Sequence, residues 1–176
     1  MGVADIEIFP VNVSNGTLGM SQMPGRNGRL ADDLSAIEDW RPALVISMTT
    51  GAEFAEAGQA DMGALIQAMG IDWCHFPVAD YATPTAQQAR DWHAVSGRAL
   101  AVLKNGGRVL IHCMGGCGRS GMAVLRLMVE VGERPSEALD RLRAVRPCAV
   151  ETDAQFAWAA GAANIAGSEL RRNKAT

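Results

Sequence analysis

The stretch HCMGGCGRS, from His112 to Ser120, carries the strongest structural signal in this chain. It follows the apolar run RVLI at 108–111 and leads into a second apolar segment at 120–131. Glycines weaken strands and helices but let a backbone curl tightly and approach a ligand closely. The sequence therefore predicts a strand, a tight loop and a helix in succession, and we call residues 113–119 the glycine loop.

A loop that enters a helix N-terminus in this way is suited to hold an oxyanion. Its free N–H groups point in one direction, and the helix dipole adds partial positive charge. Phosphate is the commonest anion bound so. Arg119 adds a planar guanidinium that can grip two oxygens. The same positive field is expected to depress the pKa of Cys113 and favour its thiolate, which is a nucleophile. Nucleotide-binding P-loops differ, because they need Gly-Lys-Ser/Thr and no cysteine.

Outside the glycine loop, short apolar runs alternate with segments of helical periodicity. This alternation predicts a single-domain α/β fold, with a central, mostly parallel, twisted sheet flanked by helices. We expect one domain over residues 1–176, with its core at about 20–165 and frayed tails, including RRNKAT at the C-terminus. Residues 14–29 are rich in Gly, Ser and Asn and are expected to form a loop. Strands are expected at 6–13, 43–47, 71–78 and 108–113, and helices at 30–40, 60–70, 85–104, 120–131, 135–143 and from Thr152.

Composition excludes several classes of protein. The formal net charge is −3, so no overall basic field attracts nucleic acid. No stretch approaches the roughly 18 apolar residues of a membrane span. Asp5 and Glu7 stand where a secretory signal would be basic. Four cysteines in 176 residues are too few for a disulfide scaffold, so a reducing cytoplasm is the expected location. A zinc site would need a second ligand pair, and none follows Cys113 and Cys117 at zinc spacing; no metal or other cofactor is expected.

The glycine loop also resembles a known family. His-Cys-x5-Arg-Ser/Thr, the CX5R motif, is the signature of cysteine-dependent protein phosphatases, and HCMGGCGRS matches it throughout. His75-x-Pro77-x-x-Asp80, Thr83-Pro84, AVETDAQ at 149–155 and MPG at 23–25 are similar to the kinase-associated phosphatase (cyclin-dependent kinase inhibitor 3-like) branch of the dual-specificity phosphatases. The resemblance implies a phosphomonoester hydrolase that works through a phosphocysteine intermediate on phosphorylated proteins or peptides.

The resemblance assigns roles to individual residues. Cys113 is the nucleophile, and Asp80, on a loop after a strand, is the general acid; Asp72 and Asp91 are weaker candidates. Ser120 would donate a hydrogen bond to the sulfur, and His112 would support the loop by bonding to nearby backbone. Gln155 would position the hydrolytic water or, equally well, be the N3 residue of a capping box. Phosphate oxygens would contact the remaining loop residues, Met114, Gly115, Gly116, Cys117, Gly118 and Arg119.

Several interpretations stay open. Cys117 is expected to be a small apolar side chain packed behind the loop, or else to form a protective disulfide with Cys113. Tyr81 is either a border of the pocket or merely exposed. A local cluster of arginines forms either a solvated helix face or a docking patch; it consists of Arg134, Arg141, Arg143 and Arg146. Three tryptophans belong either to the core or to a substrate platform; they are Trp73, Trp92 and Trp158.

Three other functions also fit part of the pattern. A phosphoprotein-binding module without turnover would keep the glycine loop and lose the chemistry. A phosphatase of small molecules would keep both. A sulfurtransferase of the rhodanese type also uses a cysteine in an anion loop, but its loop is shorter and lacks the serine that follows the arginine.

Overall fold

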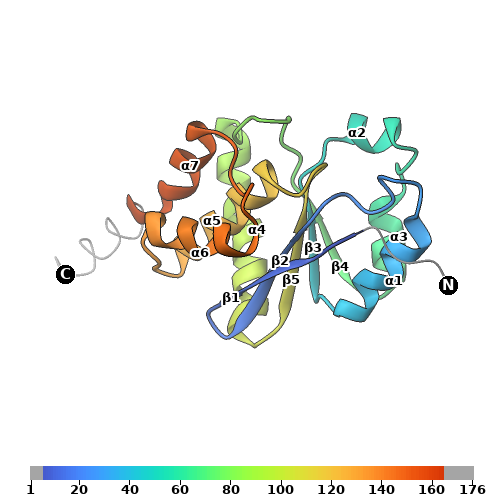
Figure 1. The fold of residues 1–176 in the computed structure, drawn as a ribbon, viewed down its shortest axis with the longest axis horizontal. Coiled ribbons are helices and arrows are strands. Elements are labelled where there is room, and N and C mark those ends of the chain that lie inside the picture. The colour runs from blue at the N-terminus through green and yellow to red at the C-terminus, as the bar shows by residue number, and fades with distance from the viewer. Residues whose placement is uncertain (1–5, 165–176) are drawn as a thin grey trace.

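A five-stranded sheet with the order β1-β2-β5-β3-β4 runs through the middle of the protein (Figure 1). The computed structural model describes residues 6–164. β1 pairs antiparallel with β2, and the other neighbours are parallel. The prediction of an α/β fold with a mostly parallel sheet is confirmed. The strands are β1 Phe9–Val13, β2 Gly16–Ser21, β3 Leu44–Ser47, β4 Asp72–His75 and β5 Arg108–His112.

Helices cover both faces of this sheet. In Figure 1, α4 to α7 lie on one side, and α1 and α3 lie on the other. The helices are α1 Leu30–Trp40, α2 Gly51–Glu56, α3 Met62–Ala68, α4 Ala86–Lys104, α5 Gly118–Glu130, α6 Pro135–Val145 and α7 Asp153–Ala160. None of the helices in the described part of the chain has both the length and the hydrophobicity needed to cross a bilayer.

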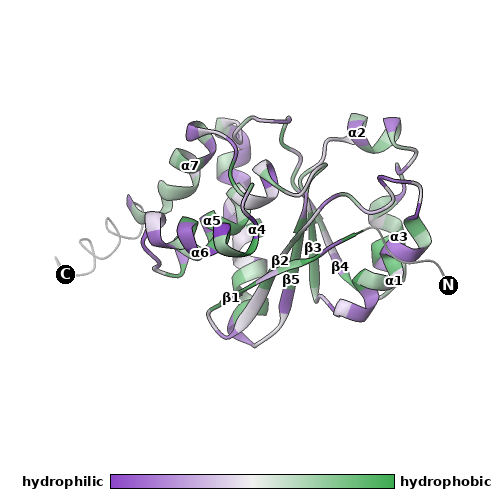
Figure 2. Cartoon of the chain, viewed as in Figure 1, coloured by the Kyte–Doolittle hydropathy of each residue, from purple (hydrophilic) through white to green (hydrophobic). Residues whose placement is uncertain are grey.

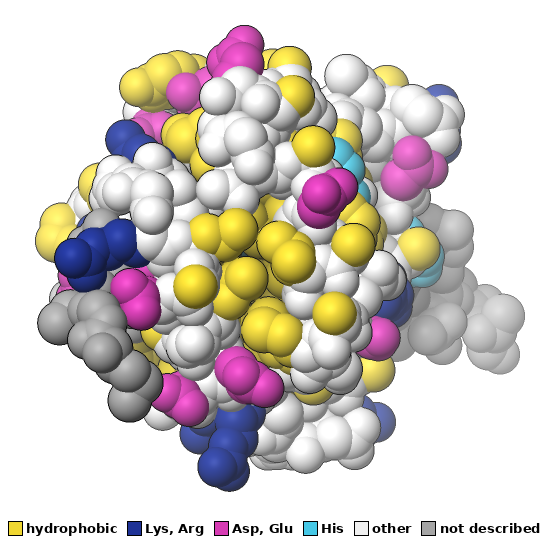
Figure 3. All heavy atoms as spheres, turned by 90° about the vertical axis from the view of Figure 1, so that its right-hand side faces the viewer, with side chains coloured by type: hydrophobic (Ala, Val, Ile, Leu, Met, Phe, Trp, Pro, Cys, Tyr) yellow, Lys and Arg dark blue, Asp and Glu magenta, His cyan; other side chains and the backbone are white. Residues whose placement is uncertain are grey.

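The central strands are buried on both faces, as expected for strands with helices on either side. All four residues of β3 are buried, and Figure 2 shows the strands as mainly hydrophobic whereas the outer helices alternate in character. Two hydrophobic clusters result, one on each face. Trp92 is buried in the larger cluster, and Trp73 and Trp158 pack against the two clusters, which favours the core interpretation of these side chains. On the α1–α3 side, hydrophobic side chains also reach the surface, as Figure 3 shows.

The register of the sheet brings three strand ends together at one point. His112, the last residue of β5, lies opposite Ser21 of β2 and Ser47 of β3. In parallel sheets the segments that follow the strand C-termini meet at the same edge and build the ligand site. The glycine loop leaves β5 at this edge.

Two elements differ from the prediction. Residues 14–29 were expected to be a loop, but they contain β2, which is mostly buried. An ideal Cβ at Gly16 would lie 2.4 Å from the Gly107 oxygen, and one at Gly19 would lie 2.8 Å from Trp40. These glycines therefore permit close packing of a strand. The helix α2 was not predicted at all. The expected frayed tail at 171–176 lies outside the described residues.

Candidate functional site

Cys113 is the first residue after β5 and lies at the base of the site. Its side chain is buried, and its Sγ lies 3.4 Å from the Oγ of Ser120 in the first turn of α5. A cavity of about 160 Å³ opens above it, lined by Arg26, Asp80, Tyr81, Cys113, Met114, Gly115, Cys117, Gly118 and Glu151. The structure thus brings the predicted nucleophile, the predicted general acid and the loop backbone to one cavity.

The carbonyl groups of the glycine loop are bonded from outside the loop. Met114 O accepts from Met23 N at 3.2 Å, and Cys117 O accepts from Val150 N at 3.2 Å. The carbonyls of Gly115 and Gly116 accept from Arg146. Outward carbonyls leave the loop N–H groups for an anion on the inner side.

Gly116 makes the tight curl of this loop possible. Its φ is +69°, in the left-handed region, and an ideal Cβ there would lie 2.5 Å from the Ser21 carbonyl carbon. Any side chain at this position would be strained and would also collide with β2.

Arg119 is buried, and the two terminal nitrogens of its guanidinium are held by hydrogen bonds. Nη1 and Nη2 each donate to one oxygen of Glu53 at 2.7 Å, and Nη1 also donates to the Val78 carbonyl at 2.9 Å. Nε is buried and has no hydrogen-bond partner within residues 6–164. The expected two-oxygen grip is therefore made on Glu53, which leaves Nε as a buried donor without a partner.

Glu53 is fixed by its own local structure. It is N3 of a capping box at the start of α2, where Thr50 N donates to its Oε2 at 2.8 Å. The hydrogen bond from Arg119 is the main cause that lowers the pKa of Glu53 from 4.5 to about 2. Burial opposes the charge on Arg119, but the Glu53 hydrogen bond and the nearby negative groups raise the Arg119 pKa overall. The pair is thus ionised on both sides.

Asp80 is exposed and stands on the cavity wall. Its Oδ1 accepts from the Tyr81 N–H at 3.1 Å and lies 3.4 Å from Arg119 Nη2. Tyr81 lines the same cavity and is also 63% exposed, so both interpretations of this residue hold. The other two carboxylates lie elsewhere: Asp72 contacts Arg98, and Asp91 accepts from Gln87 on α4.

His112 is buried directly below the loop. Its Nε2 lies 2.6 Å from Ser47 Oγ, which also accepts from the Trp73 indole N–H at 2.9 Å. Burial is the main cause that lowers the pKa of His112 to about 4. His112 is therefore a neutral ring at neutral pH that joins β5 to β3 through a side-chain hydrogen bond.

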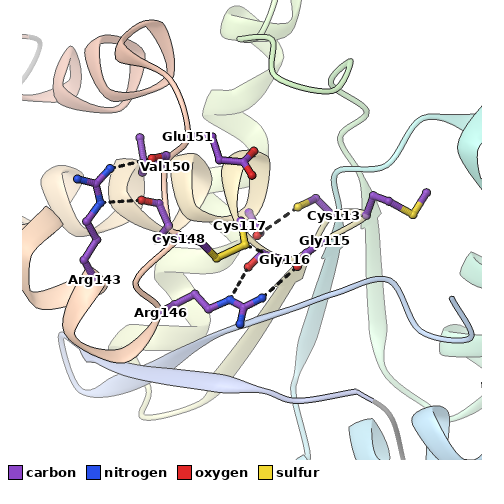
Figure 4. The surroundings of a disulfide bond; sticks show 12 residues. Cys113, Gly115, Gly116, Cys117, Arg143, Arg146, Cys148, Val150 and Glu151 are labelled. Atoms are coloured by element: carbon purple, nitrogen blue, oxygen red, sulfur yellow. Dashed lines mark hydrogen bonds between the residues drawn. A yellow bond between two sulfur atoms is a disulfide. The ribbon is translucent and has the colours of Figure 1, made fainter. Parts of the chain in front are cut away.

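The structure corrects both interpretations of Cys117. Its sulfur is bonded to Cys148, with a Cα–Cα distance of 5.3 Å, so it is neither a packed free thiol nor a partner of Cys113 (Figure 4). The sequence pattern assigns no role to Cys148, because this residue lies 31 positions after Cys117. α5 and α7 pack together, and this contact brings the segment before α7 onto the loop.

The arginines on and beside α6 divide into two sets: Arg134 and Arg141 make exposed ion pairs, as the solvated-face interpretation expects, whereas Arg143 and Arg146 bond to backbone carbonyls. Arg146 donates to the carbonyls of Gly116 and Gly115, both at 3.1 Å, and Arg143 donates to Ala149 and Val150 (Figure 4). Arg134 pairs with Glu137, and Arg141 pairs with Glu133. We call residues 146–151, which the disulfide and these arginines hold against the glycine loop, the C-terminal clamp.

Gln155 is fully buried at the start of α7. Its Oε1 accepts from Glu151 N at 2.9 Å and from Thr152 N at 3.3 Å, and its N–H closes the capping box with Thr152. The capping-box interpretation is confirmed. A role in positioning water stays a prediction.

Sequence reasoning missed three charged residues at the site. The Thr50-x-x-Glu53 spacing is a capping-box signal and could have located α2, but nothing local pairs Glu53 with Arg119. Glu151 and Arg26 reach the cavity from segments far from the glycine loop along the chain. No cluster of side chains suited to hold a metal occurs within residues 6–164.

Known proteins resemble this chain over most of its length. Cyclin-dependent kinase inhibitor 3 of Mus musculus is 31% identical over 148 residues, which span 79% of this chain and 68% of the mouse protein. The Rattus norvegicus protein of the same name is 32% identical over 172 residues, which span 87% of this chain and 79% of the rat protein.

Solved structures share the fold. A kinase-associated phosphatase with serine in place of its catalytic-site cysteine superposes with a TM-score of 0.81 and 23% identity, over 93% of this chain and 97% of that one. The active form of Tk-PTP gives a TM-score of 0.65 and 26% identity, over 84% of this chain and 91% of Tk-PTP.

A family model described as "Tc-R-P: Polymorphic toxin system, DSP-PTPase phosphatase" matches residues 18–133. This range holds the Asp80 loop, β5 and the whole glycine loop. With the cysteine, the arginine and the cavity already in place, the chain belongs to this family of dual-specificity-type, cysteine-dependent protein phosphatases.

Proposed function

We propose that this phosphatase hydrolyses phosphorylated proteins or peptides through a phosphocysteine on Cys113. The observation that carries the proposal is the position of the Cys113 sulfur, buried at the base of a cavity of about 160 Å³ with the Asp80 carboxylate on its wall. The names of the relatives, which include a kinase inhibitor and a kinase-associated phosphatase, support a phosphoprotein substrate.

In the first step, phosphate oxygens bind the inward N–H groups of the glycine loop and Arg119 Nε. The Cys113 thiolate attacks phosphorus in line with the leaving oxygen. The O–P bond breaks, and Asp80 gives its proton to the departing oxygen. Preplaced donors around the phosphoryl oxygens supply most of the stabilisation, because they need no reorganisation as charge develops.

In the second step, the oxygen of a water molecule bonds to phosphorus, a carboxylate on the cavity wall takes the water proton, and the S–P bond breaks with its electron pair returning to the Cys113 sulfur. The Oγ of Ser120, 3.4 Å from the sulfur, donates a hydrogen bond that stabilises the returning thiolate. Arg119 stays oriented through Glu53, and the neutral His112 holds β5 in place below the loop.

We propose that residues 1–176 form one phosphatase domain; its core extends before the expected limit of about 20, because Val11, Val13 and Leu18 belong to the larger buried cluster. A cytoplasmic location also stays a prediction. It was inferred from the small number of cysteines, and the Cys117–Cys148 disulfide does not support it, since such bonds persist mainly in oxidising compartments.

Turnover of an aryl phosphate tests the proposal. We expect Cys113→Ser to abolish turnover and Asp80→Ala to lower kcat by about 100-fold or more while phosphopeptide binding is retained. Asp91→Ala is the matched control and should behave as wild type, because Asp91 lies on α4 outside the cavity. Phosphopeptide binding without turnover by the wild type, or turnover by Cys113→Ser, would overturn the proposal.

A further inference from the structure

A second carboxylate, that of Glu151, stands with Asp80 on the wall of the cavity. An ideal Cβ at Gly118 would lie 2.1 Å from Glu151 Oε2, so the carboxylate rests directly over the Gly118 backbone. Figure 4 shows this side chain extending from the C-terminal clamp over the glycine loop. With glycine at position 118, the carboxylate can lie in this place without moving.

The backbone that carries Glu151 is fixed to the glycine loop. Cys148 is bonded to Cys117, and Val150 N donates to Cys117 O at 3.2 Å. Val150 has a φ of 64°, which is rare for a β-branched residue and persists only where the surroundings impose it. Glu151 N donates to the buried Gln155 at 2.9 Å. The fold thus fixes the backbone that carries the carboxylate beside the cavity, and the side chain itself is exposed to solvent.

The electrostatic setting of Glu151 suits a proton acceptor. The pKa of Glu151 is raised overall: burial is the largest cause, the charge of Asp80 adds to it, and the charge of Arg119 opposes it. A carboxylate with a raised pKa is a stronger base than an ordinary one. Asp80 differs, because its Oδ1 already accepts from Tyr81 and contacts Arg119.

We propose that Glu151 is the general base of the second step and takes a proton from the water that attacks the phosphocysteine. This rests on the phosphocysteine mechanism proposed above. The water oxygen bonds to phosphorus, and the S–P bond breaks with its electron pair returning to Cys113. The water proton passes to Glu151, which later releases it to solvent. Asp80 then serves mainly the leaving oxygen of the first step.

Rapid-mixing kinetics with p-nitrophenyl phosphate separate the two steps. We expect Glu151→Gln to keep the initial burst of p-nitrophenolate, which reports the first step, and to lower steady-state turnover by about 100-fold. Phosphocysteine should accumulate and be recovered by acid quench and mass spectrometry. Glu151→Asp should recover part of the lost turnover, since it restores a carboxylate.

Asp153→Asn is the matched control, because Asp153 is an exposed carboxylate in the first turn of α7 that does not line the cavity. It should leave both phases unchanged. Glu151→Gln with wild-type turnover, or with a slowed burst and no accumulated phosphocysteine, would overturn the inference. A retained burst amplitude shows that the variant is folded. A wild type that forms no phosphocysteine at all would instead refute the underlying mechanism.

Discussion

On one flank of the glycine loop, an ion pair between Glu53 and Arg119 fixes a guanidinium; on the other, a disulfide and Arg146 fix the backbone. The first flank depends on charge and on a capping box only four residues long. The second depends on a covalent bond across 31 residues of sequence. The difference indicates that each flank can be weakened by a different agent: the charged flank by acid, the covalent flank by reductant.

Breaking the covalent flank should have the largest effect on stability. We expect Cys148→Ser to lower the free energy of unfolding by about 3 to 4 kcal/mol, because the unfolded chain regains the entropy of a 31-residue loop. Urea denaturation with and without a thiol reductant measures this. Reductant should lower the wild-type midpoint to that of Cys148→Ser and leave the variant unchanged. Equal midpoints for the oxidised wild type and the variant would show that the clamp adds no stability.

Breaking the charged flank should cost less and should depend on pH. We expect Glu53→Gln to lower stability by about 2 kcal/mol at pH 7, since Arg119 is 1% exposed and loses its counter-charge. Glu56→Gln, an exposed change on the same helix, is the control. The Glu53 pKa falls from 4.5 to about 2 on folding, so its stabilisation is complete above pH 4.5 and is lost as pH falls towards 2.

His112 adds a second pH window to the same experiment. The pKa of His112 is about 4 in the folded chain and 6.5 ordinarily. Between pH 4 and pH 6.5 the ring is therefore protonated in the unfolded chain and neutral in the folded chain. Wild-type stability should therefore decline as pH falls from 6.5 to 4, and again from 4.5 to 2. Glu53→Gln should flatten only the lower decline. If the variant loses both declines or neither, the assignment of the lower one to Glu53 is wrong.

The smallest expected loss of stability comes from replacing an arginine that bonds to backbone carbonyls, compared with one in a surface ion pair. Arg146→Lys should cost about 1 kcal/mol, because an ammonium cannot reproduce two parallel bonds to the Gly115 and Gly116 carbonyls. Arg134→Lys, in an exposed pair with Glu137, should change stability by less than about 0.5 kcal/mol. Thermal unfolding of the two variants side by side provides the measurement. Equal losses would mean that Arg146 is no more than a surface charge.

The sequence predicted the parts of the site that are local in the chain. Cys113 and Arg119 share one short loop between a buried strand and a helix, and this arrangement follows from glycine content and hydrophobic pattern alone. Asp80 could be found because it stands on a loop after a strand. These signals each lie within a few residues.

The parts that were missed depend on tertiary contacts. Glu53 meets Arg119 at a separation of 66 residues, and Cys117 meets Cys148 only because α5 packs on α7. β2 was missed because its glycines looked like loop residues; they actually allow Trp40 and Gly107 to approach the strand. Propensity describes a segment by itself, whereas these positions are set by what packs against them.

The disulfide also determines how Cys113, the proposed nucleophile, can respond to oxidants. An oxidised cysteine nucleophile, as a sulfenic acid, is commonly protected by condensing with a nearby resolving thiol. Cys117 is already bonded to Cys148, and the free cysteines are Cys113 itself and Cys74 on β4. Protection of oxidised Cys113 therefore cannot come from Cys117 and falls to a thiol from solution or to a backbone nitrogen; without either, further oxidation to the sulfinic acid would be irreversible.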